Sequence, residues 1–317
     1  IAIDLGYGSV KLITNKSMCK FPSAVSPVKR SLIEPTETLY QFNGLNYIVG
    51  DDAVSDAYGT RDYSFMEKFA PLLTYKALKD LGVDFNSPIN LATGLSLLNW
   101  DKKERFAQAL QNIVVNNEHV DNIELSIYPQ GKGIFVDCLK NHPRLTNELV
   151  MVVDIGYNTL DVIPFKNGKA LSKDAFANTF GVNKIIQELS KYIVSMYNLS
   201  LNEAEVNEVF QNKYLTVGTR KDLTMIIDEE KQKYIDQICQ IIKSHNNELF
   251  TKTDTIIIAG GGAYTFDNFE FADKKEIPFV AVLGDEELKN NQISLKNMKN
   301  GDQQLISISE LIKCIKP

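Results

Sequence analysis

Cysteine is scarce in this chain of 317 residues, and its four copies are too widely spread to form a cluster. They are Cys19, Cys138, Cys239 and Cys314. Neighbouring cysteines are at least 75 residues apart, which argues against a disulfide framework or a zinc site. The three histidines are equally dispersed; they are His119, His142 and His245. This use of cysteine favours a reducing, cytoplasmic setting.

Long hydrophobic runs and an excess of positive charge are also missing. No apolar run approaches the roughly 18 residues that a membrane-spanning helix needs, and the first residues resemble a strand, so we expect no signal peptide. With 34 Lys and Arg against 40 Asp and Glu, the net charge is −6. This charge argues against a protein whose whole surface binds nucleic acid. Glycine (18) and proline (10) are too few for a collagen-like or low-complexity chain.

The hydrophobic pattern predicts an α/β protein of about two domains. Hydrophobic residues make up 44% of the chain, and single cores rarely grow beyond roughly 250–300 residues. Short apolar runs alternate with stretches of helical spacing. Strands are expected at 1–5, 9–14, 45–49, 88–93, 123–128, 149–154, 160–165, 256–259 and 279–283. Helices are expected at 66–81, 102–115, 183–197 and 227–249.

Local signals refine three of these elements. Pro71 interrupts the helical pattern at 66–81 and predicts a kink or a helix start nearby. Asp101 stands where it would cap the helix at 102–115. The stretch 284–304 is polar and rich in lysine and asparagine, so we expect an exposed segment, followed by a strand and then a helix over 305–315.

A five-residue sequence occurs twice, 150 residues apart. Ile-Asp-Leu-Gly-Tyr at 3–7 is nearly repeated as Val-Asp-Ile-Gly-Tyr at 153–157. Each copy ends a predicted strand and is followed by a polar turn and a second strand. The repeat is either a chance similarity between two buried strands or the sign of two related halves, each with one Asp-x-Gly hairpin; the third glycine turn and the strand order favour related halves.

The hairpins have the chemistry of a polyphosphate site. In each, a strand ends in a carboxylate and the glycine of the turn lets backbone N–H groups approach a phosphate chain. The carboxylates of Asp4 and Asp154 suit a hydrated Mg²⁺, which prefers one or two carboxylates plus waters and phosphate oxygens. Lys11 follows on the returning strand, where its charge can face phosphate. Gly260-Gly261-Gly262, after the strand at 256–259, provides a third backbone surface.

Three segments in order resemble the nucleotide loops of the actin superfamily. Residues 4–11 (Asp-Leu-Gly-Tyr-Gly-Ser-Val-Lys) look like its first phosphate loop, and 154–161 (Asp-Ile-Gly-Tyr-Asn-Thr-Leu-Asp) like its second. Residues 256–264 look like its adenosine loop. Within the superfamily, the short chain, the form of the second loop and Tyr47-Ile-Val-Gly50 are most similar to the ParM (StbA) group of bacterial and archaeal actin-like proteins.

The resemblance implies two related actin-like, ribonuclease H-like domains around a nucleotide cleft. Domain I would cover residues 1–147 and domain II residues 148–299, with the segment from about 300 to 317 packing back on domain I. The implied cofactors are Mg²⁺, held through water by Asp4 and Asp154, and ATP, with GTP left open. The implied nucleotide-binding residues are Gly6, Tyr7, Gly8, Ser9, Lys11, Gly156, Tyr157, Asn158, Thr159, Asp161, Gly181, Asn183, Gly260, Gly261, Gly262 and Tyr264.

The implied catalytic residues are Asp4, Asp154 and Gln130. Gln130 matches the family position that orients the attacking water, a task an amide performs without acting as a base. ParM is thought to use a glutamate there, and a simple Pro-Gln-Gly turn is the alternative. Asp161 either supports the metal site or caps its hairpin. Tyr7 and Tyr157 are bulky for their loop positions and would pack beside the cleft.

The implied function is a filament-forming ATPase of plasmid or DNA segregation that reaches DNA through a basic adaptor protein. The partners would be other copies of the chain and that adaptor, with no membrane and no direct nucleic acid. Two alternatives remain: a non-polymerising scaffold of the FtsA or PilM kind, and a small-molecule kinase of the same superfold. The segment 284–304 departs from the family's C-terminal pattern.

Overall fold

The computed structural model describes residues 1–28, 38–60, 62–263, 279–282, 292–297 and 303–307. The chain forms two compact units, Ile1–Pro129 and Gln130–Pro317. The units divide upstream of the domain boundary expected at 147/148, because helix α3 (Gln130–Asn141) packs on strands β11 and β12 of the second unit.

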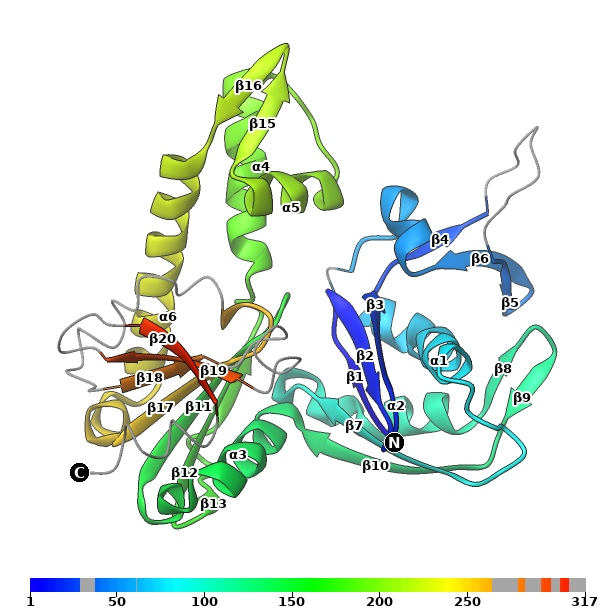
Figure 1. Cartoon of the computed structure of the whole chain (residues 1–317), viewed down its shortest axis with the longest axis horizontal. Coiled ribbons are helices and arrows are strands. Elements are labelled where there is room, and N and C mark those ends of the chain that lie inside the picture. The colour runs from blue at the N-terminus through cyan, green and yellow to red at the C-terminus, as the bar shows by residue number, and fades with distance from the viewer. Residues whose placement is uncertain (29–37, 61, 264–278, 283–291, 298–302, 308–317) are drawn as a thin grey trace. The chain divides into compact units, whose positions relative to one another are not determined.

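The first unit is built on a five-stranded sheet in the order β10-β7-β1-β2-β3 (Figure 1). Its strands are β1 (Ala2–Leu5), β2 (Ser9–Ile13), β3 (Met18–Pro22), β7 (Ile89–Leu95) and β10 (Ile123–Pro129). Strand β1 is antiparallel to β2 and parallel to β7. Helix α1 (Tyr63–Asp80) buries a largely apolar surface in the core of this unit, including Leu72, Leu73 and Leu78.

Smaller elements complete the first unit. Strands β4 (Val25–Pro27), β5 (Tyr40–Phe42) and β6 (Leu45–Val49) form a three-stranded sheet, and β8 (Ile113–Val115) pairs with β9 (Glu118–Val120). The remaining helices are η1 (Asp51–Asp56), η2 (Leu97–Lys102) and α2 (Lys103–Gln111).

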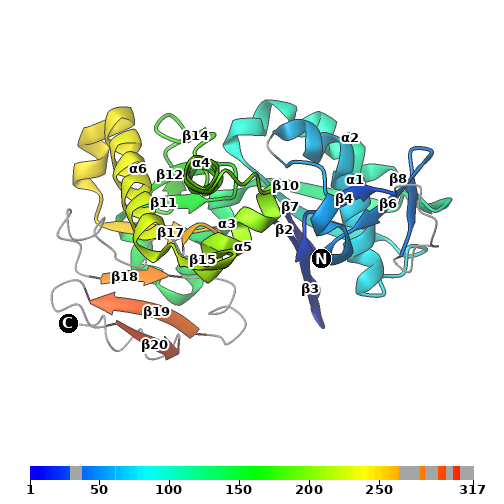
Figure 2. The ribbon, with the colours of Figure 1, turned by 90° about the horizontal axis from the view of Figure 1, so that it is seen from above.

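The second unit contains a larger sheet, β13-β12-β11-β17-β18-β19-β20, with β14 also pairing β12. Its strands are β11 (Leu149–Ile155), β12 (Leu160–Lys166), β13 (Lys169–Ala170), β14 (Phe176–Asn178), β17 (Thr255–Ala259), β18 (Phe279–Val282), β19 (Gln292–Asn297) and β20 (Gln303–Ser307). Seen from above in Figure 2, β18, β19 and β20 continue the sheet beyond β17. A short η3 turn (Pro143–Asn147) leads into β11.

An outer lobe extends from this sheet (Figure 1). We define it as α4 (Asn183–Tyr197), α5 (Glu203–Asn212), β15 (Tyr214–Val217), β16 (Thr219–Asp222) and the start of α6 (Thr224–Lys252). The lobe has its own apolar cluster, which includes Leu189, Val206 and Ile227. Helices α4 and α6 join this cluster to the core over the sheet, because both helices contribute buried residues to each.

The two main sheets repeat one strand plan, as the Asp-x-Gly repeat predicts. In each, an antiparallel hairpin (β1–β2 or β11–β12) is followed in the sheet by a parallel strand (β7 or β17) and then by another (β10 or β18). The α/β fold class is confirmed by this architecture.

Several predicted elements are confirmed and others are wrong in detail. Helix α4 has the expected bounds, but α1 begins at Tyr63 and runs through Pro71, so the helix start expected near Pro71 is wrong. Helix α2 ends at Gln111, and Ile113 lies in β8. Asp101 lies within the η2 turn, and the residue before α2 is Lys102. Asp101 therefore does not cap α2.

The C-terminal expectations meet the structure only in part. The polar stretch 284–304 contains strand β19, which the sequence does not predict. Strand β20 pairs with β19, whereas the helix expected before residue 315 and most of the segment from about 300 to 317 lie outside the described residues. Over the described ranges, no helix combines the length and apolar composition needed to cross a bilayer.

Candidate functional site

The first Asp-x-Gly hairpin is a tight turn between β1 and β2. Asp4 and Lys11 are paired across the hairpin, and Lys11 Nζ lies 3.9 Å from Asp4 Oδ2 with both side chains partly exposed. A Cβ on Gly6 would lie 2.9 Å from the Ser9 carbonyl oxygen. Ser23 supports the turn by donating its hydroxyl to Gly6 O and its backbone N–H to Gly8 O.

The second hairpin is more deeply buried. Gly156 N–H donates to Thr159 O at 2.8 Å and closes the turn between β11 and β12. Asn158 and Thr159 are 8% and 6% exposed. The Asn183 side-chain amide donates to Asn158 Oδ1 at 3.1 Å, so the start of α4 holds the turn from one side.

The two hairpins differ in the residue that lies opposite the repeated aspartate. Asp4 faces a lysine, whereas Asp154 faces Asp161, which is 2% exposed. Directly opposite like charges destabilise an antiparallel pair. A carboxylate oxygen is the kind of ligand that a hydrated Mg²⁺ prefers, so Asp154 fits a metal site on chemical grounds.

The backbone around Gly181 touches the second hairpin. Val182 N–H donates to Gly156 O at 3.1 Å and Asn183 N–H donates to Tyr157 O at 2.9 Å. A Cβ on Gly181 would lie 2.3 Å from Tyr157 O and 2.5 Å from the Asn158 carbonyl carbon. Only glycine fits at this approach, since both obstacles are backbone atoms.

The glycines after β17 reach the same end of β11. Gly260 has φ +87°, and a Cβ on it would lie 2.4 Å from Asp154 Oδ1 and from Ile155 O. Gly262 N–H donates to Ile155 O at 2.8 Å, whereas a Cβ on Gly261 would have nothing within 4 Å. Two of the three glycines are thus required by close packing. Tyr264 lies outside the described residues.

Three of the segments singled out in the sequence therefore converge within the second unit. The 260–262 segment contacts the end of β11, where Asp154 lies, and the 181–183 segment contacts the 156–159 turn that directly follows β11. The loop at 4–11 belongs to the first unit. Gln130 is the first residue of α3, and Gly131 packs against Ile163, where a Cβ would lie 2.9 Å from Cδ1.

Sequence reasoning missed several polar contacts near these loops. Asn178 Oδ1, on β14 opposite Leu160, is buried without a hydrogen-bond partner. The Tyr234 hydroxyl donates to Phe180 O at 2.9 Å, and burial raises the pKa of Tyr234 well above its usual value, so it stays a neutral donor. Tyr157 contacts α5, 46 residues away in sequence. Such long-range pairs leave no local motif.

The described residues hold no group of three or more His, Cys, Asp or Glu side chains arranged for a metal ion. A site of this kind would close around a metal with protein ligands alone. Magnesium differs because it usually keeps several waters and takes oxygens from phosphate. The single carboxylates of Asp4 and Asp154 suit that second mode.

Comparison with known proteins shows which families the chain resembles. A family model described as the N-terminal domain of actin-like proteins matches residues 2–133, and one described as archaeal actin homologue MreB-like, C-terminal, matches residues 152–270. The chain thus resembles actin-like proteins in two successive stretches. The crystal structure of an archaeal actin homologue is 18% identical with a TM-score of 0.71, and covers 91% of this chain and 95% of its own.

Two further solved structures share the actin-like fold. The same archaeal actin homologue in complex with ADP is 17% identical, with a TM-score of 0.71 over 91% of this chain and 95% of its own. A 15-stranded ParM filament from Clostridium botulinum is 19% identical, with a TM-score of 0.66 over 89% of this chain and 93% of its own. At these identities the likeness shows the fold.

The C-terminal segment has a different similarity. A family model described as an anticodon binding domain matches residues 267–317. The histidine–tRNA ligase of Clostridium tetani is 48% identical over 48 residues, 15% of this chain. The chain spans only 11% of the length of that curated relative. The departure from the ParM pattern over 284–304 therefore lies in a segment that resembles another family.

Proposed function

We propose that the chain is a filament-forming actin-like ATPase that binds and hydrolyses ATP with Mg²⁺. The observation that carries the proposal is the convergence of three glycine-bearing segments at the end of β11. Close packing at glycines without Cβ atoms keeps the backbone of these segments close to the end of β11, and glycine-bearing turns of this kind suit a phosphate chain. The ADP complex of a structure with the same fold supports this reading.

Nucleotide-binding roles are proposed for loop residues of each unit, taken separately. The loop at 4–11 would bind phosphate through Gly6, Gly8 and Ser9, with Lys11 adding positive charge. The second unit would contribute the 156–159 turn and the glycines at 181 and 260–262. The carboxylates of Asp4 and of Asp154 are each proposed to face a hydrated Mg²⁺ through its waters, and the ion would neutralise charge on the phosphates.

Gln130 is proposed to orient the attacking water. Gln130 is the first residue of α3, and Gly131 packs this helix closely against β12. The position of Gln130 therefore depends on the sheet that also contains Asp154. An amide side chain can both donate to and accept from a water, although it is no base at neutral pH. It would align the water with the terminal phosphate.

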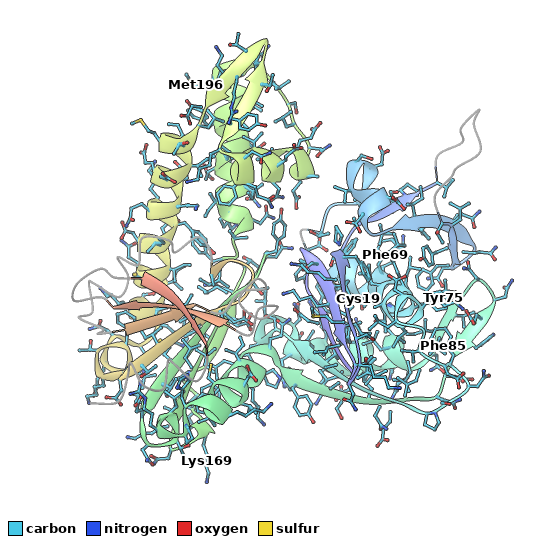
Figure 3. All side chains as sticks on the ribbon, in the orientation of Figure 1. Cys19, Phe69, Tyr75, Phe85, Lys169 and Met196 are labelled. Atoms are coloured by element: carbon cyan, nitrogen blue, oxygen red, sulfur yellow. The ribbon has the colours of Figure 1, made fainter. Side chains whose placement is uncertain are left out.

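Filament assembly is proposed on two grounds. The ParM relative of the same fold is a 15-stranded filament, and the outer lobe exposes apolar side chains: Met225 is 85% exposed and Met196, labelled in Figure 3, is 60% exposed. We propose that the filament serves plasmid or DNA segregation. Because the chain carries a net charge of −6, we propose that it binds DNA through a basic adaptor protein.

The sedimentation of the protein tests this proposal. With ATP and Mg²⁺, we expect light scattering to rise and most of the protein to pellet at high speed, because bound nucleotide favours the assembling conformation. Samples with EDTA or without nucleotide are the controls and should remain in the supernatant. If ATP binds but never changes scattering or pelleting, the non-polymerising scaffold becomes the better reading; transfer of phosphate to a small molecule would indicate a kinase.

A second proposal concerns residues 267–317. We propose that this segment serves the actin-like unit as an extension of its sheet and does not act as a tRNA-binding module. Strand β18 pairs in parallel with β17, and β19 and β20 follow antiparallel. The segment also has seven lysines against nine acidic residues, a poor balance for binding phosphates.

A filter-binding assay of the affinity for tRNA tests the second proposal. We expect the full chain to bind total tRNA no more tightly than about 10 µM at physiological salt, the range of non-specific contact. An unstructured RNA of the same length is the control and should bind equally weakly. Submicromolar binding to tRNA alone would contradict the structural role.

A further inference from the structure

Tyr157 joins the second phosphate loop to the outer lobe through its hydroxyl. The hydroxyl donates to Glu203 Oε1 at 2.7 Å and accepts from the Asn207 side-chain amide at 2.8 Å. Both partners lie on α5, four residues apart and therefore on one face of the helix. Using a hydroxyl as donor and acceptor at once requires tyrosine at this position; phenylalanine would keep the ring and lose both bonds.

Hydrogen bonds within α5 hold the partners of Tyr157 in place. Asn207 also donates its amide to the Glu203 backbone carbonyl at 2.9 Å, which fixes the orientation of the Asn207 side chain. The first turn of α5 is closed by a capping box, in which Asn202 and Glu205 exchange hydrogen bonds of 2.7 and 2.9 Å. A displacement of the tyrosine hydroxyl would therefore move α5 as a unit.

The other end of the link is the loop itself. The Tyr157 carbonyl accepts from Asn183 N–H at 2.9 Å and lies against Gly181. Its neighbour Gly156 is tied to Thr159 and Val182. The backbone of Tyr157 is thus part of the proposed phosphate site, while its side chain belongs to the lobe. Tyr7, at the matching place of the first hairpin, packs instead against the apolar core of its own unit.

We propose that Tyr157 is a positioning residue that couples occupancy of the second phosphate loop to α5 and the outer lobe. The inference rests on the proposed nucleotide binding and adds the route by which it reaches the lobe. A phosphate that draws the 156–159 backbone toward itself shifts the tyrosine hydroxyl, and Glu203 and Asn207 follow. Because α5 supplies Val206 and Val209 to the apolar cluster of the lobe, the lobe responds with it.

Hydrogen exchange of backbone amides in the full chain tests the coupling, with ADP and Mg²⁺ as the probe. In the native sequence, nucleotide should slow exchange both in the loop at 156–159 and in α5, the latter by roughly fivefold or more. In Tyr157→Phe, the loop should still respond and the nucleotide-dependent change in α5 should vanish. Asn207→Leu, which removes one of the two hydrogen bonds and leaves the bond to Glu203, should reduce the nucleotide-dependent change in α5 without abolishing it.

Two measurements keep the outcomes distinct. Glu208→Gln, on the exposed side of the same helix, is the matched control and should leave the response of α5 intact. Equilibrium dialysis reports nucleotide binding separately. If the native chain binds no nucleotide, the proposed function and the coupling both fail. If nucleotide binds and α5 responds equally in the native chain and in Tyr157→Phe, or in neither, the coupling alone is overturned.

Discussion

Replacing Asp154 with asparagine is expected to slow ATP hydrolysis at least about a hundredfold, as loss of a charge that stabilises a transition state does. The proposed role of this carboxylate is to hold hydrated Mg²⁺ beside the phosphates, and a neutral amide holds the ion poorly. Phosphate release at saturating ATP and Mg²⁺ measures the effect. Unchanged turnover would remove Asp154 from the catalytic site.

The same substitution should leave the fold intact. Asparagine has nearly the shape of aspartate, and the change removes one of two carboxylates that face each other across the β11–β12 hairpin. The free energy of unfolding should therefore stay the same or rise. Asp137→Asn is the matched control, because Asp137 lies half-exposed on α3 in an ion pair with Lys140, and both turnover and stability should remain unchanged.

Gly181→Ala should destabilise the second unit by about 3 kcal/mol or more and abolish nucleotide binding. The added methyl would lie 2.3 Å from Tyr157 O and 2.5 Å from the Asn158 carbonyl carbon. Neither backbone atom can yield without breaking the hydrogen bonds that α4 makes to the second hairpin. Urea unfolding followed by circular dichroism measures the loss of stability.

Gly133→Ala should instead raise the free energy of unfolding. Gly133 lies exposed within α3, where an added Cβ would meet nothing within 4 Å. Alanine in a helix interior is favoured over glycine by roughly 0.5–1 kcal/mol. Equal effects of the two substitutions would contradict the close packing at Gly181.

The hairpins and their loops were predictable because their signals are local. An apolar run that ends in Asp-x-Gly specifies a buried strand and a tight turn within a few residues, and this happens at both Asp4 and Asp154. The third glycine segment follows an equally plain strand, β17. The contacts among 156–159, 181–183 and 260–262 bring together segments that the sequence singles out one by one.

Other features depend on contacts that no local pattern contains. Helix α3 begins with Gln130-Gly131, typical of a turn, but stacking of Phe135 on Phe165 at 3.9 Å between ring centroids helps hold it on the sheet. Helix α1 continues through Pro71 because residues on both sides, such as Phe69 and Leu73, are buried. The bonds from Tyr157 to α5 likewise follow from tertiary packing.

Strands β17 and β18 have a consequence for how this chain can change over time. They are hydrogen-bonded neighbours, yet β17 lies in the stretch that matches an actin homologue and β18 in the stretch that matches an anticodon binding domain. The two similarities therefore meet in neighbouring strands of one sheet. A flexible linker between separate domains, by contrast, would tolerate substitution freely. Mutations on either side are subject to one shared register, so two stretches of different resemblance have to evolve as a single folding unit.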